Sequence, residues 1–98
     1  MLKKNYTKNG ATCRVTFKVP AETFAERIAL LGEFNEWDAE RHLMKKLKDG
    51  SHSVTVSLEA GQDYRFRYLI DGSRWENDEA ADSLVPNRFG TRDGLVTV

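Results

Sequence analysis

The chain contains a single cysteine, and this scarcity excludes two common ways of stabilising or equipping a small domain. One thiol cannot form an internal disulfide bond, and it cannot supply a thiolate cluster for a metal ion. Cys13 falls on the apolar phase of a strand-like segment. We therefore predict that Cys13 is a buried thiol.

Net charge and long apolar runs are also lacking. Lys plus Arg and Asp plus Glu both total 15, so the formal net charge is zero and no global field gathers nucleic acid. No apolar run approaches the length of about 18 residues that a membrane span requires, and no apolar signal segment follows the basic residues 1–10. We expect a cytoplasmic protein that binds neither nucleic acid nor membranes, and a neutral ligand suits this charge balance.

Motifs for catalysis and metal binding are missing as well. Carboxylates cluster in one short stretch, at Glu76, Asp78, Glu79 and Asp82. Such a cluster is typical of a solvated face, because a glycosidase needs its carboxylate pair on opposite sides of a cleft. His42 and His52 have no second ligand at metal-binding spacing, and no serine lies in a Gly-x-Ser-x-Gly context. The sequence therefore predicts no catalytic residue, no metal site and no cofactor.

Alternating apolar and polar residues predict an all-β fold for this 98-residue chain, which has the length of one domain. Strand-like segments recur between turns, at residues 13–19, 28–31, 53–58, 64–70, 74–76 and 95–98. Residues 21–27 fit a helical turn by composition, and residues 77–94 are expected to be irregular. Six or seven short strands with frequent turns are typical of a β-sandwich.

The longest predicted strand, residues 64–70, separates two kinds of side chain. Tyr64, Phe66, Tyr68 and Ile70 share one face, whereas the arginines at positions 65 and 67 share the other with Leu69. We expect the aromatic face to enter the core and the arginines to point away from it.

Two tryptophans stand among turn-forming residues, where a large indole has no evident core to enter. Trp37 ends the segment Gly32-Glu33-Phe34-Asn35-Glu36-Trp37, and Trp75 follows the turn Asp71-Gly72-Ser73-Arg74. An exposed indole can stack on the apolar C–H face of a sugar ring. The hydroxyl groups at the ring edge then need polar partners, for which Arg67, Thr91 and Asn77 are the candidates. The alternative for either indole is a structural role in the sandwich.

Phe34 and Asn35, which precede Trp37, are expected to be architectural. We expect the Phe34 ring to enter the core and the Asn35 side chain to fix the turn by hydrogen bonding. Neither residue is a candidate for ligand contact.

In order and spacing, several segments resemble family 48 carbohydrate-binding modules. The matching segments are Gly32–Trp37, Asp49-Gly50, Tyr64–Ile70, Asp71-Gly72, Trp75–Asp78 and Phe89-Gly90-Thr91. The family includes the glycogen-binding domain of the AMP-activated protein kinase β subunit and the early-set (E-set) domains that precede the catalytic barrel in isoamylases and glycogen branching enzymes. The resemblance covers residues 12–98 and leaves residues 1–11 as an N-terminal extension. It implies an immunoglobulin-like early-set β-sandwich of about seven strands that binds α-1,4-glucan without catalysis.

The resemblance also implies roles for single residues. Trp37 and Trp75 match the family's two sugar-stacking tryptophans, and Arg67 falls where the kinase domain has a sugar-contacting lysine. Phe89 matches an apolar residue that projects beside the bound glucan in the kinase domain, and Thr91 matches a polar contact there. The alternatives are a solvated strand arginine for Arg67 and an aromatic ring that pins its loop to the core for Phe89.

The sequence departs from the resemblance at Asp93-Gly94, where the kinase domain has two asparagines, the second of which binds sugar. Gly94 has no side chain for that contact, and we expect Asp93 to replace it in part. Two functions stay open at this point. The first is a non-catalytic module that binds α-glucan oligosaccharides or polysaccharides such as glycogen or starch. The alternative is an E-set protein-interaction or scaffold domain associated with a glycogen-metabolising enzyme, without sugar binding.

Overall fold

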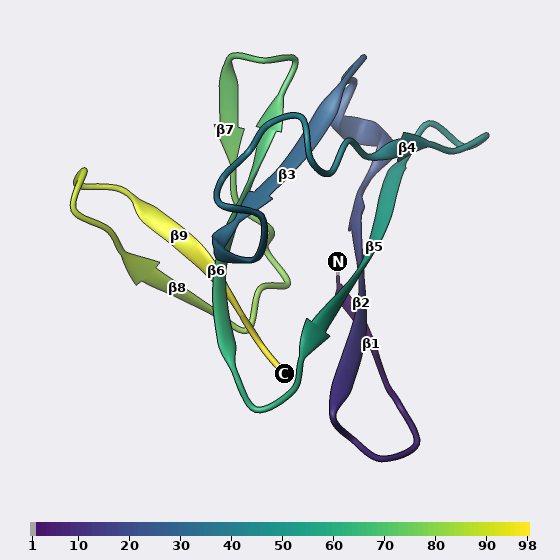
Figure 1. Ribbon diagram of the computed structural model, residues 1–98. Coiled ribbons are helices and arrows are strands. Elements are labelled where there is room, and N and C mark those ends of the chain that lie inside the picture. Colours follow the sequence, from purple (N-terminus) through teal and green to yellow (C-terminus); the bar gives the residue numbers. More distant parts are fainter. Residues whose placement is uncertain (1) are drawn as a thin grey trace.

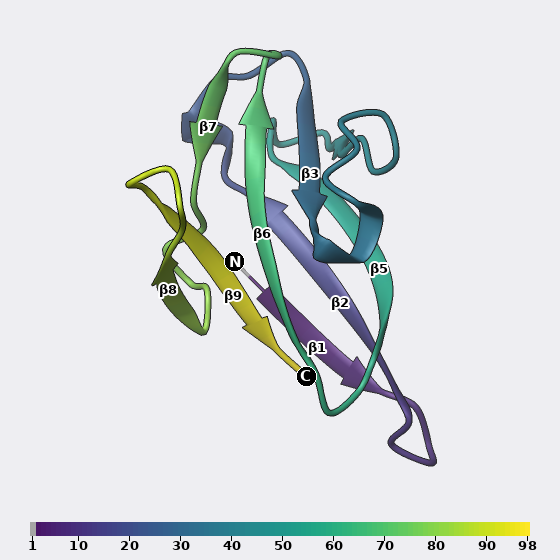
Figure 2. The same cartoon turned by 60° about the vertical axis from the view of Figure 1, so that its left-hand side comes forward.

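Two antiparallel β-sheets face each other in the computed structural model, which describes residues 2–98 (Figure 1). The first sheet has the strand order β1-β2-β5-β4, and its strands are β1 (Leu2–Tyr6), β2 (Thr12–Val19), β4 (Lys45–Lys46) and β5 (His52–Glu59). The second sheet has the order β3-β6-β9-β8, with β7 paired to β6, and its strands are β3 (Ile28–Gly32), β6 (Asp63–Ile70), β7 (Arg74–Glu76), β8 (Ser83–Pro86) and β9 (Arg92–Thr97). Figure 2 shows β6 and β3 in front of β2 and β5 of the first sheet. The predicted all-β, immunoglobulin-like sandwich is confirmed.

The core lies between the sheets and is built from the alternation seen in the sequence. Phe66, Tyr68 and Ile70 of β6 are at most 2% exposed and face the first sheet, where the Phe17 ring lies 5.1 Å from that of Phe66. Cys13 is a free thiol and is fully buried, as predicted. The arginines of β6 therefore lie on the outer face of the second sheet.

One polar pair enters this core at its edge. The Tyr68 hydroxyl donates a hydrogen bond of 2.7 Å to the buried carboxylate of Asp78. Burial, together with the charge of Asp78, raises the pKa of Tyr68 far above its usual range. The phenol is therefore a neutral donor at any physiological pH.

The segment that the sequence sets apart as an N-terminal extension contributes β1 to the first sheet. The Lys4 ammonium forms an ion pair of 2.7 Å with Asp82, which precedes β8, and the Tyr6 hydroxyl donates to the Val98 carbonyl. Burial opposes ionisation of Asp82, but the hydrogen bonds from Lys4 and from the Thr97 N–H lower its pKa. These contacts connect β1 to the other sheet.

Three short strands, β1, β4 and β8, were not predicted from the sequence. β1 and β8 lie at sheet edges with one neighbour each, and β4 has only two residues. β8 lies within the stretch predicted to be irregular, and β9 begins at Arg92 rather than at Leu95. Short, exposed edge strands that carry charges or proline lack the alternating pattern of strands with a buried face, so their pairing partner decides their conformation.

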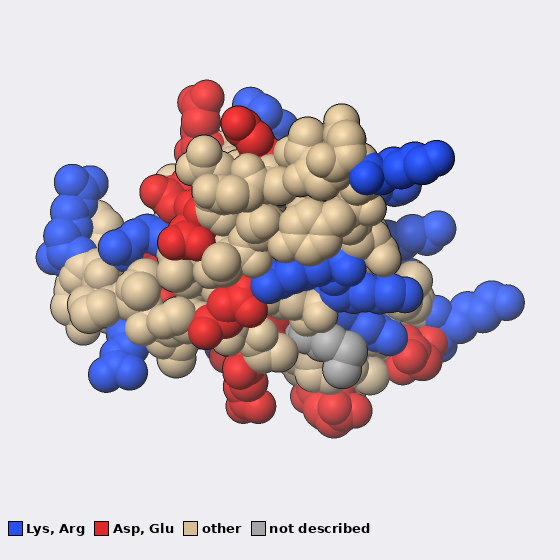
Figure 3. Space-filling view, turned by 90° about the horizontal axis from the view of Figure 1, so that it is seen from below, with Lys and Arg blue, Asp and Glu red and all other residues tan. Residues whose placement is uncertain are grey.

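Helical structure within residues 2–98 consists of two 3₁₀ turns, η1 (Ala21–Thr23) and η2 (Glu33–Asn35). The helical turn expected over residues 21–27 is therefore shorter than predicted. No helix in this part of the chain is long and apolar enough to cross a membrane. Side chains of both charge signs share the face seen in Figure 3, as the zero net charge suggests.

Candidate functional site

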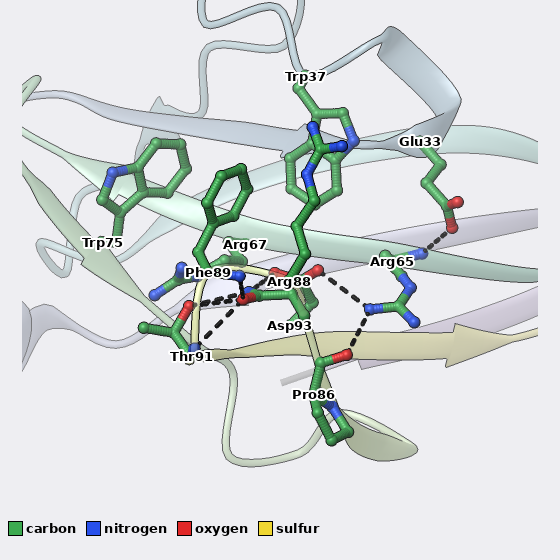
Figure 4. Close-up of a pocket in the computed structure, with 11 residues that line it drawn as sticks. Glu33, Trp37, Arg65, Arg67, Trp75, Pro86, Arg88, Phe89, Thr91 and Asp93 are labelled. Carbon is green, nitrogen blue, oxygen red and sulfur yellow. Dashed lines mark hydrogen bonds and ion pairs between the residues drawn. The ribbon is translucent and has the colours of Figure 1, made fainter.

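An open groove with a volume of about 790 Å³ runs over the outer face of the second sheet (Figure 4). Five of the six predicted sugar-binding residues line it, namely Trp37, Arg67, Trp75, Phe89 and Thr91. Asp93, which was expected to replace a sugar contact in part, also lines the groove. The other lining residues, Glu33, Arg65, Pro86, Asn87 and Arg88, were not predicted as ligand contacts. The groove therefore joins η2, β6, β7 and the β8–β9 hairpin, which are far apart in sequence.

Trp37 reaches the groove because the backbone takes two successive left-handed residues. Glu36 and Trp37 have φ angles of +57° and +59°, which are uncommon for residues with a side chain. The buried Asn35 amide fixes the turn: its Oδ1 accepts from the Gly32 N–H at 3.0 Å, and its Nδ2 donates to the Leu30 carbonyl at 2.8 Å. The prediction that Asn35 fixes this turn is confirmed.

Phe34 packs beneath the same turn. Its ring lies 5.9 Å from that of Phe17 and 6.1 Å from that of Tyr64, as predicted for a residue that enters the core. Trp37 does not belong to the buried core cluster and is 37% exposed. The turn thus packs the half-buried Phe34 against the core and presents Trp37 to the groove.

Trp75 is the middle residue of the short strand β7 and stands opposite Leu69 of β6 in the strand register. It is 45% exposed, and it too lies outside the core cluster. The Arg67 guanidinium carbon lies 5.3 Å from the centre of the Trp75 ring, a cation–π contact that covers one indole face. Figure 4 shows Phe89 projecting between the two tryptophans in this view.

Arg65 and Asp93 form the base of the groove. Arg65 Nη1 lies 3.4 Å from Asp93 Oδ2 and donates to the Pro86 carbonyl at 3.0 Å, while the Arg65 N–H donates to Glu33 Oε1 at 2.6 Å. Asp93 is only 7% exposed. Through these contacts, Arg65 of β6 connects η2 on one side to β8 and β9 on the other.

The expectation that Gly94 removes a sugar contact is corrected by the orientation of β9, which turns position 94 away from the groove. A Cβ atom on Gly94 would lie 3.2 Å from the Phe66 ring, so this position faces the core. Asp93 is the residue of this pair that lines the groove. A side chain at position 94 would point into the core rather than toward a ligand in the groove. The glycine at this position therefore removes no ligand contact from the groove.

Asn87 organises the hairpin that carries Phe89 and Thr91. Its Oδ1 accepts from the N–H groups of Phe89 at 3.0 Å and Thr91 at 3.2 Å, and its Nδ2 donates to Asp93 Oδ1 at 3.1 Å. Phe89 is 77% exposed, so its ring does not pin the loop to the core. The Asn-x-x-Gly segment that ends at Gly90 is the sequence signal that could have identified this side-chain-fixed turn.

Comparison with known proteins bears on this arrangement. The profile of the family described as Carbohydrate-binding module 48 (Isoamylase N-terminal domain) matches residues 4–85. The chain belongs to this family. A curated relative, the 1,4-alpha-glucan branching enzyme GlgB of Photobacterium profundum, is 42% identical over 50 residues, which are 50% of this chain and 7% of that enzyme. The chain thus matches only a small part of that relative's length.

The match of this family 48 module includes both tryptophans and Arg67 but ends before Phe89 and Thr91. The groove therefore combines residues inside the matched region with the β8–β9 turn and β9, which lie beyond it.

Asn77 is the predicted contact that the structure does not bring to the groove. Its Nδ2 donates to the Arg92 carbonyl at 3.0 Å, and the residue lines a second, separate pocket beside Tyr68 and Asp78. Residues 2–98 of the family 48 module contain no group of three or more His, Cys, Asp or Glu residues that could hold a metal ion. The predicted site residues that the structure brings together supply three aromatic rings, one guanidinium group and one hydroxyl.

Proposed function

We propose that this family 48 module binds α-1,4-glucan, with glycogen or starch as natural ligands, and performs no catalysis of its own. The observation that carries the proposal is the convergence of Trp37, from the turn after η2, and Trp75, from β7, on one open groove beside the exposed Phe89 ring. A curved glucan presents the C–H faces of successive glucose rings. Two indoles at different points of one groove suit such a ligand.

Stacking supplies most of the binding free energy in this proposal. Covering about 100 Å² of apolar surface at roughly 25 cal/mol per Å² contributes ~2 to 3 kcal/mol for each tryptophan. Immobilising a flexible oligosaccharide offsets much of this gain, so we expect a Kd on the order of 10⁻⁵ to 10⁻³ M. Weak binding at one site suits a polymer that offers many equivalent sites.

Hydroxyl groups at the sugar ring edges need hydrogen-bonding partners in the groove. Arg67 has donors beside Trp75, and its Nε has no partner within the described residues. The Thr91 hydroxyl already bonds to the Asn87 side chain, which holds it in place at the groove. Because Thr91 donates its hydroxyl proton to Asn87 Oδ1, its oxygen is left to accept from the sugar, while Arg67 donates. Polar groups positioned in this way favour one orientation of the glucan on the indoles.

A second candidate function, protein interaction beside a glycogen-metabolising enzyme, is favoured by one observation. Phe24 is 89% exposed at the end of η1, in a left-handed conformation with a φ angle of +52°. It lines the second pocket rather than the groove. An exposed phenylalanine away from the sugar site is a typical contact for a protein partner.

Titration of the protein with maltoheptaose, followed by tryptophan fluorescence, tests the proposed function. Cellohexaose, a β-linked glucan, is the matched control ligand, and Phe24→Ser is the matched control variant. We expect a saturable change with maltoheptaose alone, unchanged in Phe24→Ser. No change up to ~10 mM, above the expected Kd range, would reject glucan binding and favour the protein-interaction role.

A further inference from the structure

The groove contains two arginines, Arg67 and Arg88, that no carboxylate neutralises. Neither forms an ion pair with another residue of the described chain, whereas Arg65 is paired with Asp93. The lining residues include three arginines against the carboxylates of Glu33 and Asp93, which leaves the groove a formal charge of +1. The chain as a whole has a net charge of zero. The surplus positive charge is therefore local to the groove.

Each unpaired guanidinium lies beside an aromatic ring. The Arg67 guanidinium carbon is 5.3 Å from the centre of the Trp75 ring, and that of Arg88 is 5.1 Å from the centre of the Phe89 ring. Figure 4 shows the Arg88 side chain rising toward Trp37. Both cations thus lie in the groove lining, next to aromatic rings on which a sugar would stack.

The donors of Arg67 are not satisfied by the protein. Its Nε is buried and has no hydrogen-bond partner in the described residues. A ligand would contact the terminal nitrogens of the guanidinium, which are not among the buried unpartnered atoms of the described residues. A neutral hydroxyl can accept a hydrogen bond from these nitrogens, but it leaves the positive charge uncompensated. An anionic oxygen supplies both the acceptor and the charge, which makes the hydrogen bond shorter and stronger.

We propose that the groove binds α-glucan carrying phosphate monoesters more tightly than unmodified α-glucan. This inference rests on the proposed function, because the indoles hold the sugar chain that presents the phosphate. A phosphate monoester carries about −1.5 to −2 charges at neutral pH, and its oxygens match the planar fork of an arginine. Arg67 and Arg88 are the residues that recognise it.

The test compares maltoheptaose with maltoheptaose carrying a 6-phosphate, by isothermal titration at about 20 mM and about 200 mM NaCl. We expect roughly three- to tenfold tighter binding of the phosphorylated ligand at low salt, because exposed charge pairs contribute modestly. The preference shrinks at high salt. Inorganic phosphate alone is expected to bind far more weakly than the phosphorylated glucan.

The Arg67→Gln and Arg88→Gln variants identify the residues responsible. The quantity compared is the ratio of the two affinities, so a general loss of glucan binding does not affect the reading. We expect each variant to lower the ratio and the double variant to bring it to about one. Arg92→Gln, which removes the same charge from a residue outside the groove lining, is the control and keeps the ratio.

The outcomes separate this inference from the proposed function. Equal affinity for both ligands, a preference that survives in the double variant, or inorganic phosphate binding as tightly as the phosphorylated glucan would each overturn the inference and leave glucan binding standing. Failure of both ligands to bind would overturn the proposed function and the inference together.

Discussion

Replacing Trp75 with alanine separates a ligand role from a core role. The residue is 45% exposed, so of the roughly 250 Å² that a tryptophan can bury, about 110 Å² is open to a ligand. Covering half to all of that area at roughly 25 cal/mol per Å² contributes about 1.4 to 2.8 kcal/mol. Trp75→Ala should therefore weaken maltoheptaose binding about 10- to 100-fold.

The same variant should remain folded. The covered part of Trp75 lies against the half-buried Arg67 on the outer face of the sheet, outside the core cluster. We expect a loss of about 1 to 2 kcal/mol in the free energy of unfolding, below the 3 to 5 kcal/mol that is typical of a buried tryptophan.

Titration calorimetry measures the affinity of Trp75→Ala, and urea denaturation measures its stability. Leu84→Ala is the matched control, because Leu84 is also 45% exposed but does not line the groove. That control should keep its affinity. A Trp75→Ala protein that binds as the wild type does, or that loses more than about 3 kcal/mol of stability, would refute the assignment of this indole to a ligand site.

Three further variants test how the site is supported. A Cβ atom on Gly32 would approach the Arg65 carbonyl and the Phe34 ring to 2.7 Å. Gly32→Ala should therefore lower the free energy of unfolding, measured by urea denaturation, by about 1 to 3 kcal/mol. An unchanged free energy of unfolding would show that the turn has room for a methyl group. Burial and then the charge of the adjacent arginine lower the pKa of His42 below 6.5, so the folded state favours the neutral ring. As the pH falls, the unfolded state takes up the proton before the folded state does, so the free energy of unfolding should be constant above pH 6.5 and fall between pH 6.5 and the folded pKa of His42. Tm measured from pH 8 to 5 should fall with pH in the wild type and fall less in His42→Gln. Identical Tm profiles for the two proteins would contradict the lowered pKa of His42. Asn87→Ala removes the side chain that fixes the β8–β9 hairpin and should lower glucan affinity about 3- to 10-fold at a stability cost of about 1 kcal/mol, whereas an affinity equal to the wild type would mean that the hairpin order is not needed.

Much of the fold was predicted from the local alternation of apolar and polar residues along each strand. The phase of residues 64–70 placed Phe66 in the core and Arg67 outside it, because each strand has one buried and one exposed face. The turn residues before Trp37 and Trp75 likewise indicated that each indole follows a reversal of the chain rather than lying in a buried strand. These features depend on a few neighbouring residues, so the sequence displays them directly.

Features that depend on distant partners were not predictable in this way. β8 is an exposed edge strand whose conformation follows from pairing with β9. Asn77 turns from the groove to the Arg92 carbonyl, a contact between separate segments. At Asp93 and Gly94, a shift of one residue exchanges the groove face for the core face, and spacing alone does not resolve that shift.

The most direct measurement uses the indole N–H signals of the two tryptophans in a ¹H–¹⁵N NMR spectrum. Trp37→Phe and Trp75→Phe assign the two signals. Titration with maltoheptaose should shift both signals along saturating curves that share one Kd, and cellohexaose should shift neither. If both indole signals stay in place at maltoheptaose concentrations of about 10 mM, the groove does not bind α-glucan, and its exposed aromatic residues serve another ligand.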